Sequence, residues 1–558
     1  MKLFGHRARL IVVFLFFIIA LIALLWRILD LTILNRKFLQ GQGDARSLRV
    51  VDIPAYRGMI TDRNGVPLAV STPVESVWIN PNDCFPSNMQ LRSLSKLLNI
   101  PVSILSKKIQ ITRGREFVYL KRQLPPAITK KIAALNIHGL YFQQEFKRYY
   151  PEGASTAQLL GFTNIDDQGI EGIELGAQDW LMGISGRKRV LKDRTGGIIN
   201  ELMVLQKPKA GHDLALSIDR RLQYLAFDEL QKTLEVFAAQ SGTVIVLDTQ
   251  TGEILATANA PSFNPNTRAD YPHNYYRNKA VTDVFEPGSI IKPFSIASAL
   301  ESKQVTTDTI IDTRPSWMVV NGHVIRDIHN YGVLDVTGVL QRSSNVGITK
   351  MILLSPAEQL INLLQRFGFG QRTESGYPGE SDGTVVKIKE ANPFVLATLG
   401  FGYGLSVTAL QIAKAYMVFA NHGVLKPVTL LHNSSVKRSA KLDLRVLDTA
   451  TADQVLLMLE AVLGNAGTGK QARVAGYRVA GKTGTARVAG DKGYATNRHI
   501  ASFVGIAPVS NPRLVVVVVI HEPTKHGYYG AVVAAPLFAK VMSNALRILD
   551  VPPDRINV

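Results

Sequence analysis

Cysteine is nearly absent from this sequence. Cys84 is the only cysteine among 558 residues, so no disulfide can form within the chain, and no zinc or iron–sulfur site can be built from cysteine ligands. Charged residues are also scarce, at 19%, whereas apolar residues make up 46%. This balance excludes a disordered tail or a collagen-like rod and predicts packed cores over most of a chain long enough for three or more domains.

Several chemical signatures are missing or incomplete. No G-x-S-x-G elbow occurs, which weakens an α/β-hydrolase interpretation, and no zinc finger or basic block indicates nucleic acid. Residues 464–470 resemble a phosphate-binding P-loop, but Gln471 stands where a Mg²⁺-binding Ser or Thr is needed, and a predicted helix precedes the segment in place of a strand. His521 and His526 are five residues apart with a proline between them, so one helix cannot direct both at a zinc ion. We therefore expect no nucleic-acid, nucleotide or metal site.

One long apolar run lies near the N-terminus. Residues 10–26 are 17 consecutive apolar residues, about 25 Å of helix, which is within the range that spans a bilayer. Lys2, Arg7 and Arg9 precede the run, so the positive-inside rule predicts a cytoplasmic N-terminus and an exterior position for everything after residue 27. A cleavable signal peptide is the alternative, but bulky residues stand at 26–28 where small ones are needed for cleavage. We predict an uncleaved, single-pass signal anchor.

The net charge of the chain is strongly positive. It amounts to +19, of which residues 1–49 contribute +6, so +13 is spread over the predicted exterior part. Such an excess fits either a solvated basic surface or an anionic partner, and both interpretations stay open.

The sequence pattern of the predicted exterior part changes along its length. Short apolar runs and turn signals alternate at first and predict a mixed, irregular domain. Farther on, predicted strands at 244–248 and 253–257 form a hairpin, helical patterns fill roughly 290–470, and strands follow at 500–507 and 514–521. Strands at both ends with helices between them predict one α/β (α+β) domain. The predicted organisation is a tail at 1–9, an anchor at 10–26, a juxtamembrane linker at 27–49, a pedestal domain at 50–210 and a catalytic domain at 211–558.

Three short motifs carry the strongest chemical signal. Their order is the one found in penicillin-interacting serine enzymes: Ser289-Ile290-Ile291-Lys292, then Ser343-Ser344-Asn345, then Lys482-Thr483-Gly484. Ser-x-x-Lys alone is weak evidence, because the chain has further copies at Ser93, Ser185 and Ser434, and a second Ser-x-Asn occurs at Ser262. Only the copy at Ser289 follows a Pro-Gly break and opens an apolar run, which places this serine at the start of a predicted buried helix.

That placement has chemical consequences. Residues three apart share a helix face, so Lys292 can reach Ser289 Oγ, and a desolvated neutral amine there could act as general base. The partial positive charge at a helix start favours the developing alkoxide. Lys482 lies in a strand-like stretch, 477–487, in which Gly484 allows close approach of a substrate to the backbone. A strand edge beside a helix start can supply two N–H groups as an oxyanion hole.

With these motifs the sequence resembles the class B penicillin-binding proteins, the monofunctional D,D-transpeptidases of bacterial cell-wall synthesis. The resemblance covers nearly the whole chain. It rests on pedestal motifs at 57–65, 148–151, 161–164 and 168–174, and on catalytic-domain motifs at 285–289, 401–404 and 480–486. Segments 281–289, 338–347 and 528–530 are similar to the septal branch of Gram-negative division, and the elongation branch is the alternative within the family. No glycosyltransferase domain fits before residue 210, which argues against a bifunctional class A enzyme.

The resemblance implies a penicillin-binding transpeptidase fold, an antiparallel sheet flanked by helices, and a catalytic role for each motif. Ser289 would attack the penultimate D-Ala carbonyl of a pentapeptide stem and release the terminal D-Ala. Lys292 would deprotonate Ser289, Ser343 would relay a proton to the leaving amine, and Asn345 would hold the stem amide. An amine of a neighbouring stem, that of meso-diaminopimelate, would then resolve the acyl-enzyme.

The third motif is implied to bind substrate. Lys482 would be the catalytic-motif lysine that binds the substrate carboxylate together with Thr483 and Thr485, while Gly484 lies between them in the substrate-binding strand. Backbone N–H groups of Ser289 and Thr485 would form the oxyanion hole. The resemblance implies no metal ion and no organic cofactor. It implies a protein of the inner membrane with a periplasmic catalytic domain, β-lactams as inhibitors, and a SEDS-type glycosyltransferase and other division proteins as partners.

Two interpretations from other classes remain. A scaffold without turnover would not need all three motifs, whereas a β-lactam-hydrolysing or β-lactam-sensing protein would use them. A class A β-lactamase needs a carboxylate that activates water in a Glu-x-x-Leu-Asn-like segment, and residues 358–362 are a near match. However, residues 355–358 are typical of a capping box that opens an amphipathic helix, so we predict that Glu358 caps a helix.

Overall fold

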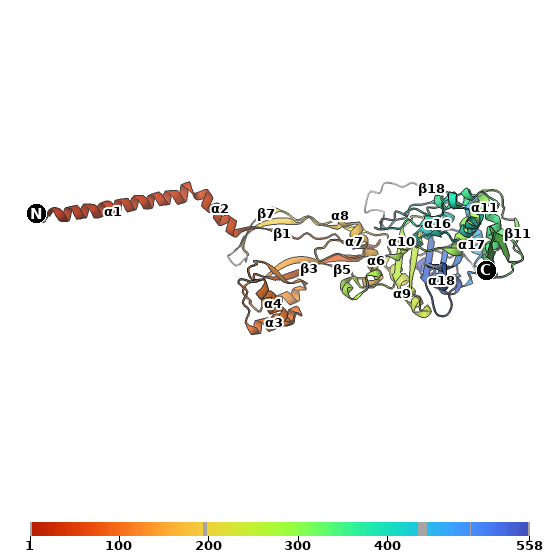
Figure 1. Cartoon of the computed structure of the whole chain (residues 1–558), viewed down its shortest axis with the longest axis horizontal. Coiled ribbons are helices and arrows are strands. Elements are labelled where there is room, and N and C mark those ends of the chain that lie inside the picture. Colours follow the sequence, from red (N-terminus) through yellow and green to blue (C-terminus); the bar gives the residue numbers. More distant parts are fainter. Residues whose placement is uncertain (1–2, 193–197, 433–442, 491–492, 556–558) are drawn as a thin grey trace. The chain divides into compact units, whose positions relative to one another are not determined.

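The computed structural model describes residues 3–192, 198–432, 443–490 and 493–555 (Figure 1). The chain divides into two compact units. The first unit contains Met1–Tyr56, Thr72–Lys147 and Gly183–Gly211, and the second contains Arg57–Ser71, Arg148–Met182 and His212–Val558. Each unit is described by itself.

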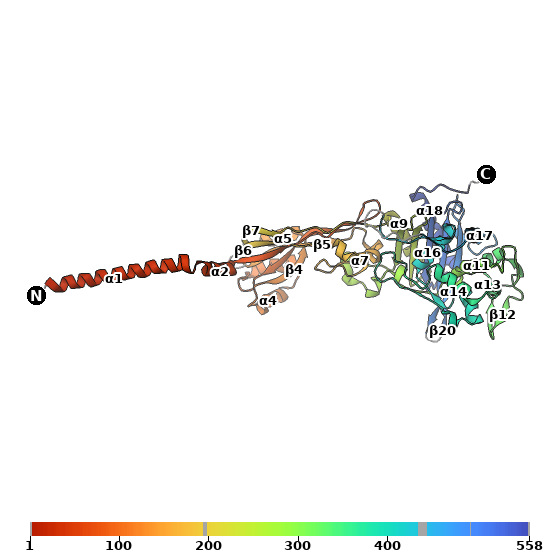
Figure 2. The ribbon, with the colours of Figure 1, turned by 90° about the horizontal axis from the view of Figure 1, so that it is seen from above.

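The first unit begins with an apolar helix. Helix α1 (Leu3–Leu29) continues through a short π-helical turn, Asp30–Leu34, into α2 (Arg36–Ser47). Within Gly5–Leu34, the most apolar window of 18 residues has a mean hydropathy of 3.0, and none of this window is buried in protein, as a membrane anchor requires (Figure 2). The segment predicted as a juxtamembrane linker therefore contains a helix. A second apolar helix, Gly530–Ile548, is half buried and belongs to a protein core.

The remainder of the first unit is built from two small sheets and three helices. Strands β1 (Leu48–Ile53), β6 (Gly186–Lys192) and β7 (Ile198–Gln206) form an antiparallel sheet. Strand β3 (Pro67–Ile79), which belongs to this unit from Thr72 on, pairs with β4 (Val118–Leu124) and with β5 (Leu140–Tyr149), which belongs to it as far as Lys147. The helices are α3 (Asn88–Leu98), α4 (Val102–Ile111) and α5 (Pro126–Ala133). Cys84 is a free thiol in the core beside them, and burial raises its pKa to about 11.

A five-stranded antiparallel sheet organises the second unit. Its strand order is β10-β9-β21-β20-β19. The strands are β9 (Ser241–Asp248), β10 (Ile254–Ala260), β19 (Ala480–Gly490), β20 (Gly493–Ala507) and β21 (Leu514–His521). The predicted hairpin and the two predicted late strands are confirmed, and the last strands complete the sheet because β21 pairs directly with β9.

Helices cover this sheet. Helices α9 (Arg220–Phe237) and α18 (Gly530–Ile548) lie side by side and pack against β9, β10, β20 and β21, while α16 (Ala409–Ala420) and α17 (Thr449–Ala461) pack against the sheet as a second pair (Figure 2). Continuous apolar sequence explains the central position of β21, whose residues from Leu514 to Ile520 are all buried. An antiparallel sheet flanked by helices is the fold expected from the resemblance.

Shorter elements complete the second unit. The helices are α6 (Ala157–Leu160), α7 (Gly172–Gly176), α8 (Gln178–Leu181), α10 (Lys279–Thr282), α11 (Lys292–Glu301), α12 (Val336–Arg342), α13 (Asn345–Ile352), α14 (Ala357–Arg366) and α15 (Pro393–Gly400). The strands are β2 (Ile60–Thr61), β8 (Leu214–Ala215), β11 (Ile310–Asp312), β12 (Trp317–Val320), β13 (His323–Arg326), β14 (Val333–Asp335), β15 (Thr384–Val385), β16 (Leu405–Ser406), β17 (Val424–Leu425) and β18 (Leu444–Arg445).

The predicted capping box at residues 355–358 is wrong. Helix α14 is amphipathic as predicted, with Leu360, Ile361 and Leu364 buried, but its N-cap is Pro356, which has no side-chain hydrogen bond to offer. The Ser355 hydroxyl lies one residue too early and is buried without a partner among the described residues. Proline at the cap fixes an extended backbone there, and this local geometry excludes the serine from the capping position.

A buried ion cluster joins distant segments of the second unit. Glu174 accepts from Arg57 Nε at 2.7 Å and from Arg148 Nε at 2.6 Å, and all three side chains are at most 1% exposed. Arg57 also donates to the Glu174 carbonyl at 2.9 Å and to Gln178 Oε1 at 2.8 Å. Because the Arg57 and Arg148 guanidinium groups are desolvated, the cluster depends on every member being present.

We expect Glu174→Ala to destabilise the protein by about 3–5 kcal/mol, because the substitution leaves two buried guanidinium groups without their carboxylate. The exposed pair Arg372–Asp382 offers a matched control, since its side chains are 64% and 55% exposed and Arg372→Ala should cost less than about 1 kcal/mol. Denaturant unfolding of the two purified variants measures how much unfolding free energy each of them loses. A loss for Glu174→Ala no larger than that of the control would contradict the account.

Candidate active site

Ser289 lies in a tight helical turn against the edge of the large sheet. A 3₁₀ turn, Gly288–Ile291, leads into α11, so the predicted buried helix is present but its first turn is of the 3₁₀ type. Gly288 has φ of +58°, and a Cβ at this position would lie only 3.3 Å from the Thr485 carbonyl oxygen of β19. Glycine therefore allows the turn to meet the strand. Ile290 and Ile291 are fully buried beneath it and hold the turn in place.

The second motif fills a two-residue connection between helices. Helix α12 ends at Arg342, and its C-cap Ser343 has a left-handed backbone with φ of +59°. Helix α13 begins after its N-cap Ser344, whose hydroxyl accepts from Gly347 N at 2.9 Å. This connection turns Ser343 and Asn345 toward the buried amine of Lys292. Lys292 Nζ donates to the Ser343 carbonyl oxygen at 2.5 Å, to Ser343 Oγ at 3.1 Å and to Asn345 Oδ1 at 2.7 Å.

The third motif approaches the same hydroxyl from the sheet. Lys482 lies on β19 and is fully buried, and its Nζ donates to Ser343 Oγ at 3.1 Å and to the Thr483 carbonyl oxygen at 3.1 Å. Thr485 Oγ1 accepts from the backbone N–H of Gly530 at the start of α18, at 3.0 Å. The structure thus brings all three motifs together around Ser343 Oγ, although they are separated by more than fifty residues in the sequence.

Gly484 has a packing role in the structure. A Cβ added there would lie 2.3 Å from Ser502 Oγ and 2.9 Å from Ile290 Cγ2. Glycine at this position is therefore required for the turn that carries Ser289 to pack against β19, a reason different from the close approach of a substrate considered from sequence.

Burial controls the charge of both lysines. Desolvation lowers the pKa of Lys292 to about 7, and the carboxylate of Asp327 opposes this effect by favouring the ammonium form. Desolvation also lowers the pKa of Lys482 well below its usual value, and the neighbouring Lys292 lowers it further by charge repulsion. Near neutral pH, a substantial fraction of Lys292 therefore carries a free lone pair.

The Ser289 hydroxyl makes no hydrogen bond within the described part of the chain, and Lys292 is directed at Ser343 and Asn345 instead. Catalytic hydrogen bonds are often long in a ligand-free enzyme and shorten when substrate binds. The predicted contact between Lys292 Nζ and Ser289 Oγ is thus not made in this resting arrangement.

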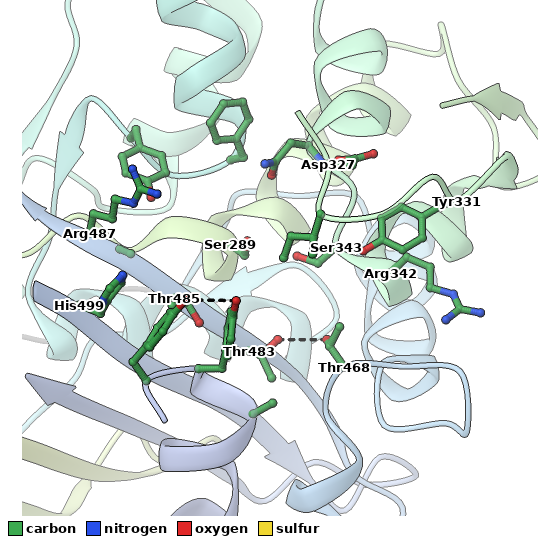
Figure 3. A pocket seen from close by; sticks show the side chains of 18 residues that line it. Ser289, Asp327, Tyr331, Arg342, Ser343, Thr468, Thr483, Thr485, Arg487 and His499 are labelled. Carbon is green, nitrogen blue, oxygen red and sulfur yellow. Dashed lines mark hydrogen bonds between the residues drawn. The ribbon is translucent and has the colours of Figure 1, made fainter. Parts of the chain in front are cut away.

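A cavity of about 550 Å³ opens over these groups. In Figure 3, Ser289 lies between one side formed by Arg487 and His499 and another formed by Ser343, Asp327 and Tyr331. Further lining residues are Arg342, Asn345, Phe401, Tyr403, Thr468, Thr483, Thr485, Tyr528 and Tyr529. The cavity is large enough for a short peptide chain.

Sequence reasoning missed several residues that line the cavity, and two of them contact the motifs directly. Asp327 accepts from Ser344 Oγ at 2.6 Å, from Asn345 N at 2.5 Å and from Val346 N at 3.1 Å, so it fixes the start of α13. Thr468 Oγ1 is 3.0 Å from Thr483 Oγ1 (Figure 3). Thr468 belongs to the glycine-rich segment considered as a P-loop, whereas nothing in the sequence around Asp327 marked it, because its partners follow 17 to 19 residues later.

Comparison with known proteins gives consistent matches over both units. The family profile described as penicillin binding protein transpeptidase domain matches residues 242–543, and the one described as penicillin-binding protein dimerisation domain matches residues 52–216. The chain is 41% identical over 548 residues to a probable peptidoglycan D,D-transpeptidase, PbpC, of Pseudomonas aeruginosa, covering 98% of this chain and 96% of that protein. It is 40% identical over 544 residues to the peptidoglycan D,D-transpeptidase FtsI of Escherichia coli K12, covering 97% and 91%.

Solved structures agree with these matches. The transpeptidase domain of penicillin-binding protein 3 from Burkholderia pseudomallei is 40% identical with a TM-score of 0.56, covering 61% of this chain and 98% of that one. A peptidoglycan synthetase from Bifidobacterium adolescentis is 27% identical with a TM-score of 0.72, covering 92% and 98%.

The electrostatics of the site predict how Lys292 titrates. We expect a pKa of about 7 for its amine, and a lower pKa in Asp327→Asn, because the substitution removes the negative charge that favours the ammonium form. Carbon-13 NMR of labelled lysine ε-carbons, assigned with Lys292→Arg, measures both values. An ordinary lysine pKa in the unmodified protein, or an unchanged pKa in Asp327→Asn, would refute the assignment.

Proposed function

The chain belongs to the penicillin-binding protein transpeptidase family, and from that premise we propose how its residues divide the reaction and where in the cell it acts. It is a serine-type peptidoglycan D,D-transpeptidase of the FtsI and penicillin-binding protein 3 type, and a target of β-lactams. The observation that carries the proposed division of roles is the convergence of two buried lysines on Ser343 Oγ beside Ser289.

Ser289 is the nucleophile. Its Oγ attacks the carbonyl carbon of the penultimate D-Ala of a pentapeptide stem, and neutral Lys292 accepts the hydroxyl proton. When the C–N bond breaks, that proton passes through Ser343 Oγ, which Lys292 Nζ contacts at 3.1 Å, to the leaving amine of the terminal D-Ala. The products of this half-reaction are an ester on Ser289 and free D-Ala.

An amine of a neighbouring stem completes the transfer. It attacks the ester carbonyl, loses its proton to the same Ser343 and Lys292 pair, and forms the cross-linking amide as Ser289 Oγ leaves and is reprotonated. The acceptor amine of meso-diaminopimelate fits this step, since the step requires a neutral primary amine at the ester.

The strand β19 binds the substrate. Lys482 pairs with the terminal carboxylate of the stem, and this arrival of negative charge favours the ammonium form of a lysine whose pKa burial lowers. Thr483 and Thr485 add hydroxyl donors, and the N–H groups of Ser289 and Thr485 stabilise the oxyanion. Asn345 directs its amide at the stem while its Oδ1 accepts from Lys292 at 2.7 Å.

The position of Glu358 favours a transferase over a β-lactamase. A deacylating water needs a carboxylate that is free to act as its base, but Glu358 lies on α14 and is absent from the described lining of the cavity. Asp327 does line the cavity, but both of its carboxylate oxygens already accept hydrogen bonds from the start of α13. The acyl-enzyme formed with a β-lactam should therefore be long-lived, as befits an enzyme that passes its acyl group to an amine.

Ser289→Ala should abolish covalent labelling by a fluorescent or radiolabelled penicillin, because the substitution removes the hydroxyl that forms the ester with the β-lactam carbonyl. Mass spectrometry of the labelled wild-type protein should place the adduct on Ser289. Ser93→Ala is a matched control, because Ser93 starts another Ser-x-x-Lys sequence, on α3 of the first unit, and labelling should be unchanged. Persistent labelling in Ser289→Ala would overturn the assignment of the nucleophile.

The location proposed for the protein follows from its anchor. Lys2, Arg7 and Arg9 favour a cytoplasmic N-terminus, so the catalytic unit is exterior to the inner membrane, where peptidoglycan is built. Likeness to FtsI supports a role at the division septum with a SEDS-type glycosyltransferase and other division proteins as partners. The elongation branch is the alternative.

One fusion protein tests both the membrane orientation of the N-terminus and the location of the protein in the cell. A green fluorescent protein fused ahead of Met1 should fluoresce, because it stays in the cytoplasm, and should concentrate at the division site of growing cells. A dark fusion with normal expression would contradict the orientation. Fluorescence spread evenly along the cell wall would favour the elongation branch.

A further inference from the structure

We infer that Glu286 is a positioning residue for the acylation step, which ties two walls of the cavity to the segment that carries Ser289. The two walls are the turn Phe401–Gly404 and the hairpin of β19 and β20. The inference rests on the proposed role of Ser289 as nucleophile. Nothing in the three catalytic motifs includes Glu286, which lies three residues before Ser289.

Backbone hydrogen bonds already attach one wall to the nucleophile segment. Phe285 and Val407 exchange N–H···O bonds of 3.0 Å in both directions, and Gly288 N donates to the Gly402 carbonyl oxygen at 3.0 Å. Gly402 has φ of +92°, and a Cβ there would lie 2.0 Å from the Gly288 carbonyl oxygen. The turn is therefore fitted directly against the residue that precedes Ser289.

Glu286 extends this attachment to the hairpin. Its Oε1 accepts from Gly404 N at 3.0 Å and from Tyr494 Oη on β20 at 3.1 Å. The rings of Tyr403 and Tyr494 meet edge to face, with centroids 5.3 Å apart, beside these bonds. One carboxylate oxygen thus joins the nucleophile segment, the turn and the hairpin.

These walls face the reacting groups. Phe401 and Tyr403 of the turn line the cavity, as does Arg487 on the hairpin, which lies on the same side of Ser289 as His499 in Figure 3. The hairpin also continues β19, on which Thr483 and Thr485 lie. A shift of the hairpin away from the turn would displace these substrate-binding groups relative to Ser289 Oγ, and a misplacement of about 1 Å can slow a reaction about a hundredfold.

The surroundings of the Glu286 carboxylate fit a role in joining these segments. Glu286 Oε2 is buried and has no hydrogen-bond partner among the described residues, and Glu286 is not among the residues that line the cavity. Contact with substrate is therefore not its role, and only Oε1 acts, as an acceptor for two donors from different segments.

Pre-steady-state acylation by a chromogenic β-lactam distinguishes an effect on the position of the reacting groups from an effect on folding. Glu286→Ala should lower the second-order acylation rate constant by about tenfold to a hundredfold, while the fraction of protein that can be acylated stays near that of the wild type. Glu286→Gln should lie within about threefold of wild type, because its amide oxygen can accept both hydrogen bonds. A merely structural role would lower the acylatable fraction and leave the rate constant of the remaining molecules unchanged.

Tyr494→Phe supplies an independent arm, because Tyr494 is 46% exposed and its ring can stay in place without the hydroxyl. This variant should acylate several-fold more slowly, and its effect should vanish in the Glu286→Ala background, since both changes remove the same bond. Tyr224→Phe, on the exposed face of α9, is the control with unchanged rate. An unchanged rate in Tyr494→Phe would overturn the inference even if Glu286→Ala failed to fold, and additive effects of the two changes would overturn it where both variants fold. Absence of wild-type acylation would instead contradict the proposed nucleophile and remove the basis of the inference.

Discussion

The site depends on the burial of two lysine amines against one hydroxyl. Lys292 and Lys482 are both fully buried, and both reach Ser343 Oγ at 3.1 Å. Two positive charges at that separation from one oxygen repel strongly where water is excluded, and desolvation penalises each charge separately. Burial and mutual repulsion therefore favour a neutral form for at least one of the two amines. A neutral amine beside a serine is what acyl transfer requires, so the need to bury these lysines explains why they are held by separate elements of a packed domain.

The fold provides that burial by placing the edge of a sheet against two helix starts. Lys482 comes from β19, Lys292 from the first residue of α11, and Ser343 from the connection between α12 and α13. Small residues set the separation of these elements, because a Cβ at Gly484 would collide with Ile290, and one at Gly288 would press on Thr485. The site is consequently as rigid as the sheet on which it is built, and its precision follows from packing rather than from loop chemistry.

Sequence could predict those parts of the molecule whose signal is local. The strands at 500–507 and 514–521 could be predicted from their β-rich composition, and the motif residues from their short spacings. Asp327 escaped detection because its partners lie on another element, and the capping box failed because Pro356 occupies the cap position. The packing role of Gly484 could not be predicted, since its neighbour Ile290 is almost two hundred residues away in the chain. Contacts between residues so far apart in the sequence can be identified only from the assembled sheet.

The hydrogen bonds of Lys292 indicate how the site must rearrange when this lysine loses a proton. Its Nζ lies within bonding distance of three acceptors, Ser343 O, Ser343 Oγ and Asn345 Oδ1, and three N–H donors are available only to an ammonium. Loss of one proton leaves two N–H groups and a lone pair, so one of the three contacts must reverse or break. A hydroxyl is the only one of the three that can donate in return, which makes Ser343 the group that changes role. In the proposed mechanism, the Ser289 hydroxyl, which makes no hydrogen bond to the described residues, joins the same chain of proton exchange when substrate binds. Loss of a single proton from Lys292 then converts a hydrogen-bonded cluster into a general base.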